Sequence, residues 1–346
     1  MSVSERPGVY SSYEVTSALY GSGTGRAVGV AAVAAGGTKG AVSLITSYAA
    51  AASLYGGSSS LTGLVKVLLE NGAPVVYAVP VVVSGTAARA DYEVAFAALM
   101  ERSEIGFMVC DSRDEAVHAA LLAAISGGEE RSKYRIGIVE SAGTASALVA
   151  LAEKLNSERM ALVGLPAAQG AAGAFAAAAA GVLAAQNDPA LPLGGAELAG
   201  VTAPDTRFSD SDVNVLIRGG VTPIEALGGI VSVIRGVTTR TTTNGTADAT
   251  WRELSTILIV DDVLPTVRDS LKTRFARTKN TAQTRGAIRT QVVIELENKK
   301  SSEIIEDYGN VTVTADESDP TVCNVRFSFT VVHGLNRIEL VAHITV

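Results

Sequence analysis

Between residues 26 and 204 the chain alternates short apolar runs with segments of helical periodicity, and this alternation restricts its fold more than any other feature. The apolar runs are almost continuous, which is typical of strands covered on both faces. They are residues 75–83, 105–110, 135–139 and 160–165. The helical segments are residues 61–70, 92–101, 114–125, 145–155 and 170–185. Because strands that alternate with helices run parallel with right-handed crossovers, the pattern predicts an α/β domain with a parallel sheet.

The composition allows a large core and argues against several classes of function. Of the 346 residues, 47% are hydrophobic and 18% are charged, which is enough to build two folded domains. The 28 basic and 35 acidic residues give a net charge of −7, which argues against a nucleic-acid partner. The two cysteines and three histidines are too few for a disulfide framework or a zinc site. We therefore expect no metal, no cofactor and no nucleic acid.

The longest uncharged stretch, residues 161–185, is mainly alanine and glycine. Alanine contributes little to membrane insertion, so this stretch predicts a helix buried in the core and not a membrane span. The first ten residues lack the apolar segment of a secretory signal. The sequence therefore indicates a protein that is made in the cytoplasm of its host and does not insert into membranes.

The remaining segments differ from the α/β pattern. Residues 1–24 are a polar arm with too few apolar residues to form a core. Residues 186–221 contain three prolines and predict a long surface loop, residues 228–240 return to strand character, and residues 238–250 predict a polar linker. Residues 254–275 predict an amphipathic helix that is bent or restarted at Pro265, and residues 281–300 predict a second helix.

The C-terminal end has strand periodicity. Apolar residues alternate with polar ones from Val325 to Val331, and a glycine-containing turn follows at residues 333–336. A second alternating run then places apolar side chains at Ile338, Leu340, Ala342, Ile344 and Val346. Two such runs around a short turn predict a β-hairpin, whose last strand leaves a sheet edge open.

Catalytic motifs are weak in this sequence. The glycine-rich residues 21–25 lack the spacing and the lysine of a phosphate-binding loop, and no GxSxG elbow is present. Residues 141–146 faintly resemble the serine segment of subtilisin-type proteases, with Asp111 as an imaginable partner. Cys110 ends an apolar strand and is predicted to be an inert core thiol. The sequence predicts no catalytic residue.

A basic run lies in the C-terminal part. Residues 268–289 contain seven basic residues and one acid, Asp269. Either this run is a solvated helix face, or it docks an acidic partner, because charge concentrated in one place steers association. The polar N-terminal arm and the terminal strand are a second non-catalytic feature. Such chain ends can pair with exposed sheet edges of neighbouring copies.

Several segments together resemble the contractile tail sheath proteins of phages and phage-tail-like bacteriocins, in their short form. The first is the opening Glu5-Arg-Pro-Gly-Val-Tyr10. The others are residues 166–181, 187–193, 233–241, 251–254 and 294–298, in that order. The likeness spans nearly the whole chain.

The resemblance implies a structural protein and not an enzyme. It implies an N-terminal arm over residues 1–24, an outer α/β domain of subtilisin-like fold over residues 25–240, and a smaller α+β inner domain over residues 241–346 that ends in a β-strand arm. Such subunits polymerise as hexameric rings in a helical sleeve that surrounds a tail tube and contracts to drive the tube through a target envelope. The expected partners are further copies of the chain, the tail tube protein, and baseplate and tail terminator proteins. The expected location is a virion or tail-like particle assembled in the bacterial cytoplasm.

The resemblance also assigns roles to three sets of residues. The N-terminal arm is expected to pair with other subunits through Val9, Tyr10, Tyr13 and Val15. The C-terminal strand is expected to do so through Ile338, Leu340, Ala342, Ile344 and Val346. A basic helix with Arg268, Lys272, Arg274 and Arg277 is expected to face the tube. Two alternatives remain open, a subtilisin-like hydrolase and another self-assembling shell protein.

Overall fold

The computed structural model describes residues 26–82, 85–129 and 134–343 of the chain. Its largest feature is an eight-stranded sheet with the order β2-β3-β1-β4-β5-β6-β7-β8. The six central strands are parallel: β3 (Val76–Pro80), β1 (Ala27–Ala32), β4 (Ile105–Cys110), β5 (Ile136–Ala142), β6 (Met160–Leu165) and β7 (Val221–Leu227). The antiparallel strands β2 (Ser43–Ile45) and β8 (Ile230–Val233) close the two ends. This sheet confirms the predicted α/β fold.

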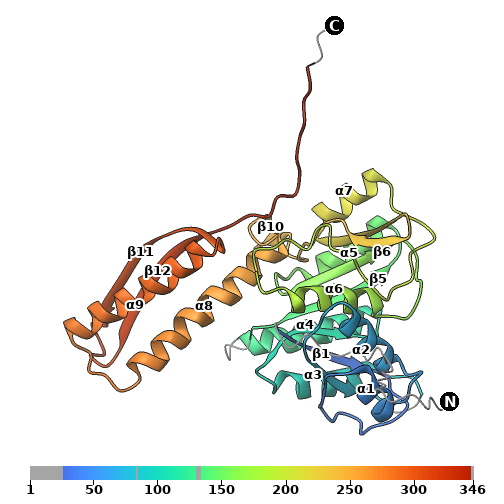
Figure 1. Cartoon of the computed structure of the whole chain (residues 1–346), viewed down its shortest axis with the longest axis horizontal. Coiled ribbons are helices and arrows are strands. Elements are labelled where there is room, and N and C mark those ends of the chain that lie inside the picture. The colour runs from blue at the N-terminus through green and yellow to red at the C-terminus, as the bar shows by residue number, and fades with distance from the viewer. Residues whose placement is uncertain (1–25, 83–84, 130–133, 344–346) are drawn as a thin grey trace, which may run out of the picture.

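Helices cover both faces of the sheet (Figure 1). One layer consists of α1 (Tyr48–Tyr55), α2 (Ser60–Glu70) and α6 (Ala174–Ala185). The other consists of α3 (Arg89–Met100), α4 (Glu115–Glu129), α5 (Ala145–Leu155) and α7 (Asp210–Arg218). Successive side chains of a strand point to opposite faces, so in β4 Phe107 enters the first core and Met108 the second. We call the sheet and its two helix layers the body.

The alanine-rich stretch forms α6, which is almost entirely buried between α2 and the sheet. Its small side chains allow close packing, because a Cβ on Gly181 would lie 2.8 Å from the backbone oxygen of Leu68 in α2. The prediction of a core helix is confirmed. None of the described helices combines the length and the hydropathy that a membrane span requires.

A second unit follows the body, and we call it the C-terminal unit. Its first helix, α8 (Leu254–Phe275), starts against the body core and extends away from it, as the orange helix in Figure 1 shows. Beside α8 lie α9 (Ala282–Ser301) and an antiparallel pair of strands, β11 (Ile305–Ala315) and β12 (Cys323–Val331). The helix α8 runs through Pro265 as one element, so it does not restart there.

The predicted C-terminal hairpin is wrong. The segment 325–331 is part of β12, as expected, but its partner is β11, and the described residues 338–343 form no strand. Alternation of apolar and polar residues predicts a strand but does not specify which strand it pairs with. Residues 332–343 leave the sheet as an extended segment without regular structure, drawn in dark red in Figure 1. Leu340 is 91% exposed within it.

The segment expected to be a linker is tied to the body. It contains a small hairpin of β9 (Thr242–Thr243) and β10 (Thr246–Ala247), with the left-handed residues Asn244 and Gly245 at its turn. The side chain of Asn156, after α5, bonds the backbone of Thr241 and Thr242. These bonds hold residues 238–250 against the body. The predicted loop at 186–221 likewise contains structure, since it includes α7.

Candidate functional site

Several polar side chains lie at the carboxyl end of the parallel strands, which is where an α/β sheet places a chemical site. Asp111, after β4, accepts hydrogen bonds from the Tyr92 hydroxyl at 2.6 Å and from the Val33 amide at 2.8 Å. Both of its oxygens are therefore used to join strand ends to α3. The carboxylate that was an imaginable catalytic partner for residues 141–146 has a structural role.

Glu140, near the end of β5, is fully buried and caps a helix. Its Oε2 accepts the amide hydrogens of Phe175 at 2.8 Å and Ala176 at 3.3 Å, at the N-terminus of α6. Its Oε1 lies 2.7 Å from Nη2 of Arg113. A carboxylate at a helix N-terminus satisfies free amides and interacts favourably with the helix dipole. Glu140 therefore links the end of β5 to the start of α6 and to Arg113 through buried hydrogen bonds. The sequence alone did not identify this residue.

The histidine and the cysteine near this edge are also buried. The Nε2 of His118 lies 2.9 Å from the backbone oxygen of Ser112, and burial lowers the pKa of its imidazole. Burial raises the pKa of the Cys110 thiol to about 12, so it stays protonated at neutral pH. Both groups fit the core in which they lie. Within the described residues, no group of three or more His, Cys, Asp or Glu side chains has a geometry that could hold a metal ion.

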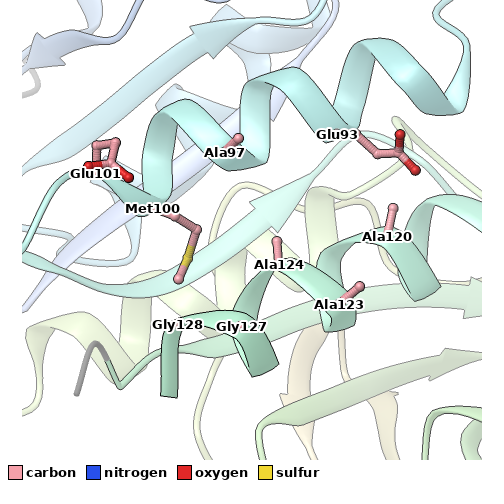
Figure 2. Close-up of a pocket in the computed structure, with 9 residues that line it drawn as sticks. All are labelled: Glu93, Ala97, Met100, Glu101, Ala120, Ala123, Ala124, Gly127 and Gly128. Atoms are coloured by element: carbon pink, nitrogen blue, oxygen red, sulfur yellow. The ribbon is translucent and has the colours of Figure 1, made fainter. Parts of the chain in front are cut away.

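A groove lined mainly by small apolar side chains lies between α3 and α4 (Figure 2). It encloses about 380 Å³, and its walls are alanines and glycines with Met100 at one end. Figure 2 shows Glu93 and Glu101 at opposite ends of the groove, with the small side chains between them. Two separated carboxylates do not converge on one point, so this groove lacks the arrangement of a catalytic site.

The extended C-terminal segment is anchored at its start and exposed beyond it. The Val332 amide donates to the Ile304 oxygen at 3.4 Å, which continues the sheet for one residue. Gly334 lies against the body, because a Cβ there would come within 2.8 Å of Cβ of Pro192. Beyond it, Leu335, Ile338, Leu340 and Val341 are strongly exposed. Among the described residues, the one ion pair of this segment joins Arg337 to Glu339, two residues further along.

The two-stranded sheet β11–β12 is incompletely covered. Val325, Phe327, Phe329 and Val331 of β12 pack against the C-terminal core, yet all four are only half-buried. The described residues place no strand beside the outer edge of either β11 or β12. Unpaired sheet edges next to half-exposed apolar side chains are surfaces to which further strands can add.

The basic run divides into bonded and exposed members. Arg289 donates to the Val311 oxygen at 3.0 Å, Arg285 bonds Asn280, and Arg268 lies over the Tyr134 ring. Lys272 and Arg274 on α8, and Arg277 just after it, are exposed and form no ion pair with the described residues. The structure therefore leaves three of the four predicted tube-facing cations available to a partner. Val9, Tyr10, Tyr13, Val15, Ile344 and Val346 lie outside the described residues.

Comparison with known proteins places two family domains on this chain. Residues 85–239 match the phage tail sheath protein central domain, and residues 246–345 match the phage tail sheath C-terminal domain. The tail sheath protein of Bacillus phage SP01 is 29% identical over 140 residues, which are 40% of this chain. That match covers 24% of the length of the SP01 protein, so it spans about a quarter of this relative.

Solved structures share the fold at low sequence identity. A chain in the baseplate of the anti-feeding prophage aligns with a TM-score of 0.75 at 16% identity, over 99% of this chain and 100% of that one. A chain of the contracted helical sheath of the anti-feeding prophage aligns with a TM-score of 0.72 at 17% identity, over 99% of both chains. The sheath tail protein of Desulfitobacterium hafniense aligns with a TM-score of 0.69 at 11% identity, over 94% of this chain and 100% of that one.

Proposed function

We propose, from the premise that this chain belongs to the phage tail sheath family, that it is the repeating structural subunit of a contractile tail sheath and not an enzyme. In this proposal the subunits form hexameric rings that stack into a helical sleeve around a tail tube. Contraction of the sleeve drives the tube through a target envelope. We assign residues 25–240 to the outer domain of the sleeve and residues 241–346 to its inner domain.

The observation that carries this proposal is the exposed, extended segment that begins at residue 335. Strand addition to a sheet edge gains main-chain hydrogen bonds, and it covers apolar side chains that alternate along the added strand. Each copy has both a segment to donate and the open edges of β11 and β12. A contact between two different surfaces need not close on itself, so repeating it builds an open helical array.

The N-terminal arm is assigned the same kind of role through Val9, Tyr10, Tyr13 and Val15. We expect the exposed cations after Arg268 to face the tail tube, and baseplate and terminator proteins to bind at the two ends of the sleeve. Contraction is proposed to release a kinetically trapped extended state, so no bound nucleotide is required. The particle is a virion or another contractile tail, assembled in the bacterial cytoplasm.

Electron microscopy of the purified chain, alone and with its tail tube protein, tests this proposal. We expect hollow sleeves or stacked rings, with tube protein either inducing them or increasing their length. The control is an unrelated α/β protein at the same concentration and in the same buffer. Uniform monomers in every sample that contains tube protein would refute the sheath function.

Reversing the exposed cations tests which surface faces the tube. Lys272→Glu, Arg274→Glu and Arg277→Glu together should reduce co-sedimentation with tube protein about tenfold or more at low salt, since each exposed pair contributes up to about 1 kcal/mol. The wild-type interaction should weaken as salt rises. The matched control reverses Lys66, Lys154 and Arg218, which are exposed on the body. Equal loss in both triple variants would show that net charge matters and not this surface.

A further inference from the structure

A polar cavity of about 400 Å³ lies where α8 leaves the body. Arg26, Tyr134 and Arg135 line it from the body, at the beginning of strands β1 and β5. Asp261, Arg268 and Asp269 line it from α8. Three arginines from separate parts of the chain therefore line one cavity between the body and the C-terminal unit.

Arg135 is the most unusual of the three, because it is only 1% exposed. Its Nη2 donates to the backbone oxygens of Met100 and Arg102, at the C-terminal end of α3. Among the described residues, its Nε has no hydrogen-bond partner and no carboxylate lies within ion-pair distance of its guanidinium. The carboxylates that act on its charge, Glu101 and Glu104, are exposed and lie beyond ion-pair distance, so an anion inside the cavity would stabilise this buried cation further.

The other two arginines also lack strong partners. The aliphatic stem of Arg26 lies across Gly106, since a Cβ at Gly106 would be 2.9 Å from its Cδ, and its guanidinium forms no ion pair with the described residues. The Arg268 guanidinium lies 5.9 Å from the centre of the Tyr134 ring. Within the described part of the chain, its one carboxylate partner is the adjacent and exposed Asp269, at 3.5 Å.

The buried acid of this cavity is already occupied. Both oxygens of Asp261 bond to the guanidinium of Arg159, at 2.7 and 2.9 Å. That carboxylate is therefore oriented toward Arg159, on the body side of the junction. Asp269 and Glu104 are exposed at the rim, where water screens them.

We propose that this cavity is a binding site for a carboxylate or a phosphate group. The planar guanidinium group of arginine can donate two parallel hydrogen bonds to a pair of oxygens of a carboxylate or phosphate. Several arginines around one cavity therefore favour these anions over chloride. Because Arg26 and Arg135 belong to the body and Arg268 to α8, a bound anion joins the two units and holds α8 at a fixed angle. The anion is either free in solution or an acidic side chain of another subunit.

Inorganic phosphate is the probe for this site. With the full-length chain, about 10 mM phosphate should raise the melting temperature by about 2 °C above sodium chloride of equal ionic strength. The double variant Arg26→Met, Arg268→Met should lose this difference, while Arg207→Met, a change of an exposed arginine on the body, should keep it. Both altered residues are partly exposed, so the double variant should fold even if Arg135→Met does not. A rise equal to that in sodium chloride, or one that the double variant retains, would overturn the site.

A second arm separates the two sources of the anion, and it rests on the proposed sheath function. If the anion is an acidic side chain of another subunit, the double variant should assemble poorly in buffer that lacks phosphate. If the anion is free, the double variant should assemble normally there and lose only the response to phosphate. The melting measurement requires no assembly, so it decides the site even if sleeves do not form.

Discussion

Deletion of residues 335–346 is expected to abolish assembly into sleeves and to leave the melting temperature of the monomer within about 1 °C of the full-length value. Leu335, Ile338, Leu340 and Val341 of the removed segment are strongly exposed, and its described ion pair is internal. The deletion begins after Val332, which bonds Ile304 just before β11, and after Gly334, which lies against Pro192 of the body. The loss should therefore be confined to contacts between subunits, and sedimentation with electron microscopy measures it.

Point variants distinguish the contribution of the apolar side chains of this segment from the contribution of its length. Ile338→Asp with Leu340→Asp should prevent assembly as fully as the deletion, because an added strand must bury one apolar face. Arg337→Ala with Glu339→Ala changes the alternate positions and should assemble. Normal sleeves from the truncated chain would show that the terminal strand is not what joins the subunits.

Replacement of Asp261 by alanine is expected to destabilise the chain by about 3–5 kcal/mol. Asp261 and Arg159 are 6% and 5% exposed, and they join α8 to the beginning of β6 by two hydrogen bonds. The substitution removes a buried carboxylate from a guanidinium that stays in the interior. Urea unfolding measures the change, and a separate early transition of the C-terminal unit would locate it at the junction.

The matched control for this variant is Asp269→Ala, two turns further along α8. Asp269 also pairs with an arginine, but that pair is exposed and its separation is 3.5 Å. Its loss should therefore cost at most about 1 kcal/mol. Similar destabilisation by both variants would mean that the effect comes from the helix itself and not from the buried pair.

The parts of the fold that could be predicted from the sequence are those where burial leaves a periodic pattern. Residues 105–110 and 160–165 are continuous apolar runs, and they form β4 and β6 with the predicted bounds. The amphipathic pattern at residues 145–155 likewise gives α5. In each case the side chains that enter the core are large enough to make the period visible.

The elements that escaped prediction have weak patterns. β1 lies in the middle of the sheet, but its sequence AVGVAA contains small residues whose burial depends on neighbouring strands. β11 has one polar face and two register shifts, which interrupt its alternation. Because the sequence pattern does not predict β11, it pairs β12 with the last residues of the chain, whereas the structure pairs β12 with β11.

The candidate surfaces were only partly predictable for a related reason. The basic run is visible in the sequence, but the separation of Arg285 and Arg289 from the exposed cations requires their contacts with Asn280 and Val311. The Arg159–Asp261 pair joins residues 102 apart, and Glu140 reaches a helix that begins 34 residues later. Contacts over such separations follow from the topology of the sheet and not from local spacing.

The contact between Gly334 and Pro192 fixes the point at which the C-terminal segment departs from its own subunit. The described residues beyond that point are 335–343, and an extended chain spans at most about 3.5 Å per residue, so they reach about 30 Å. If this segment adds to the sheet of a neighbouring subunit, as proposed, the described part of it lets the two linked subunits move apart by no more than that reach while the sleeve changes its length or width.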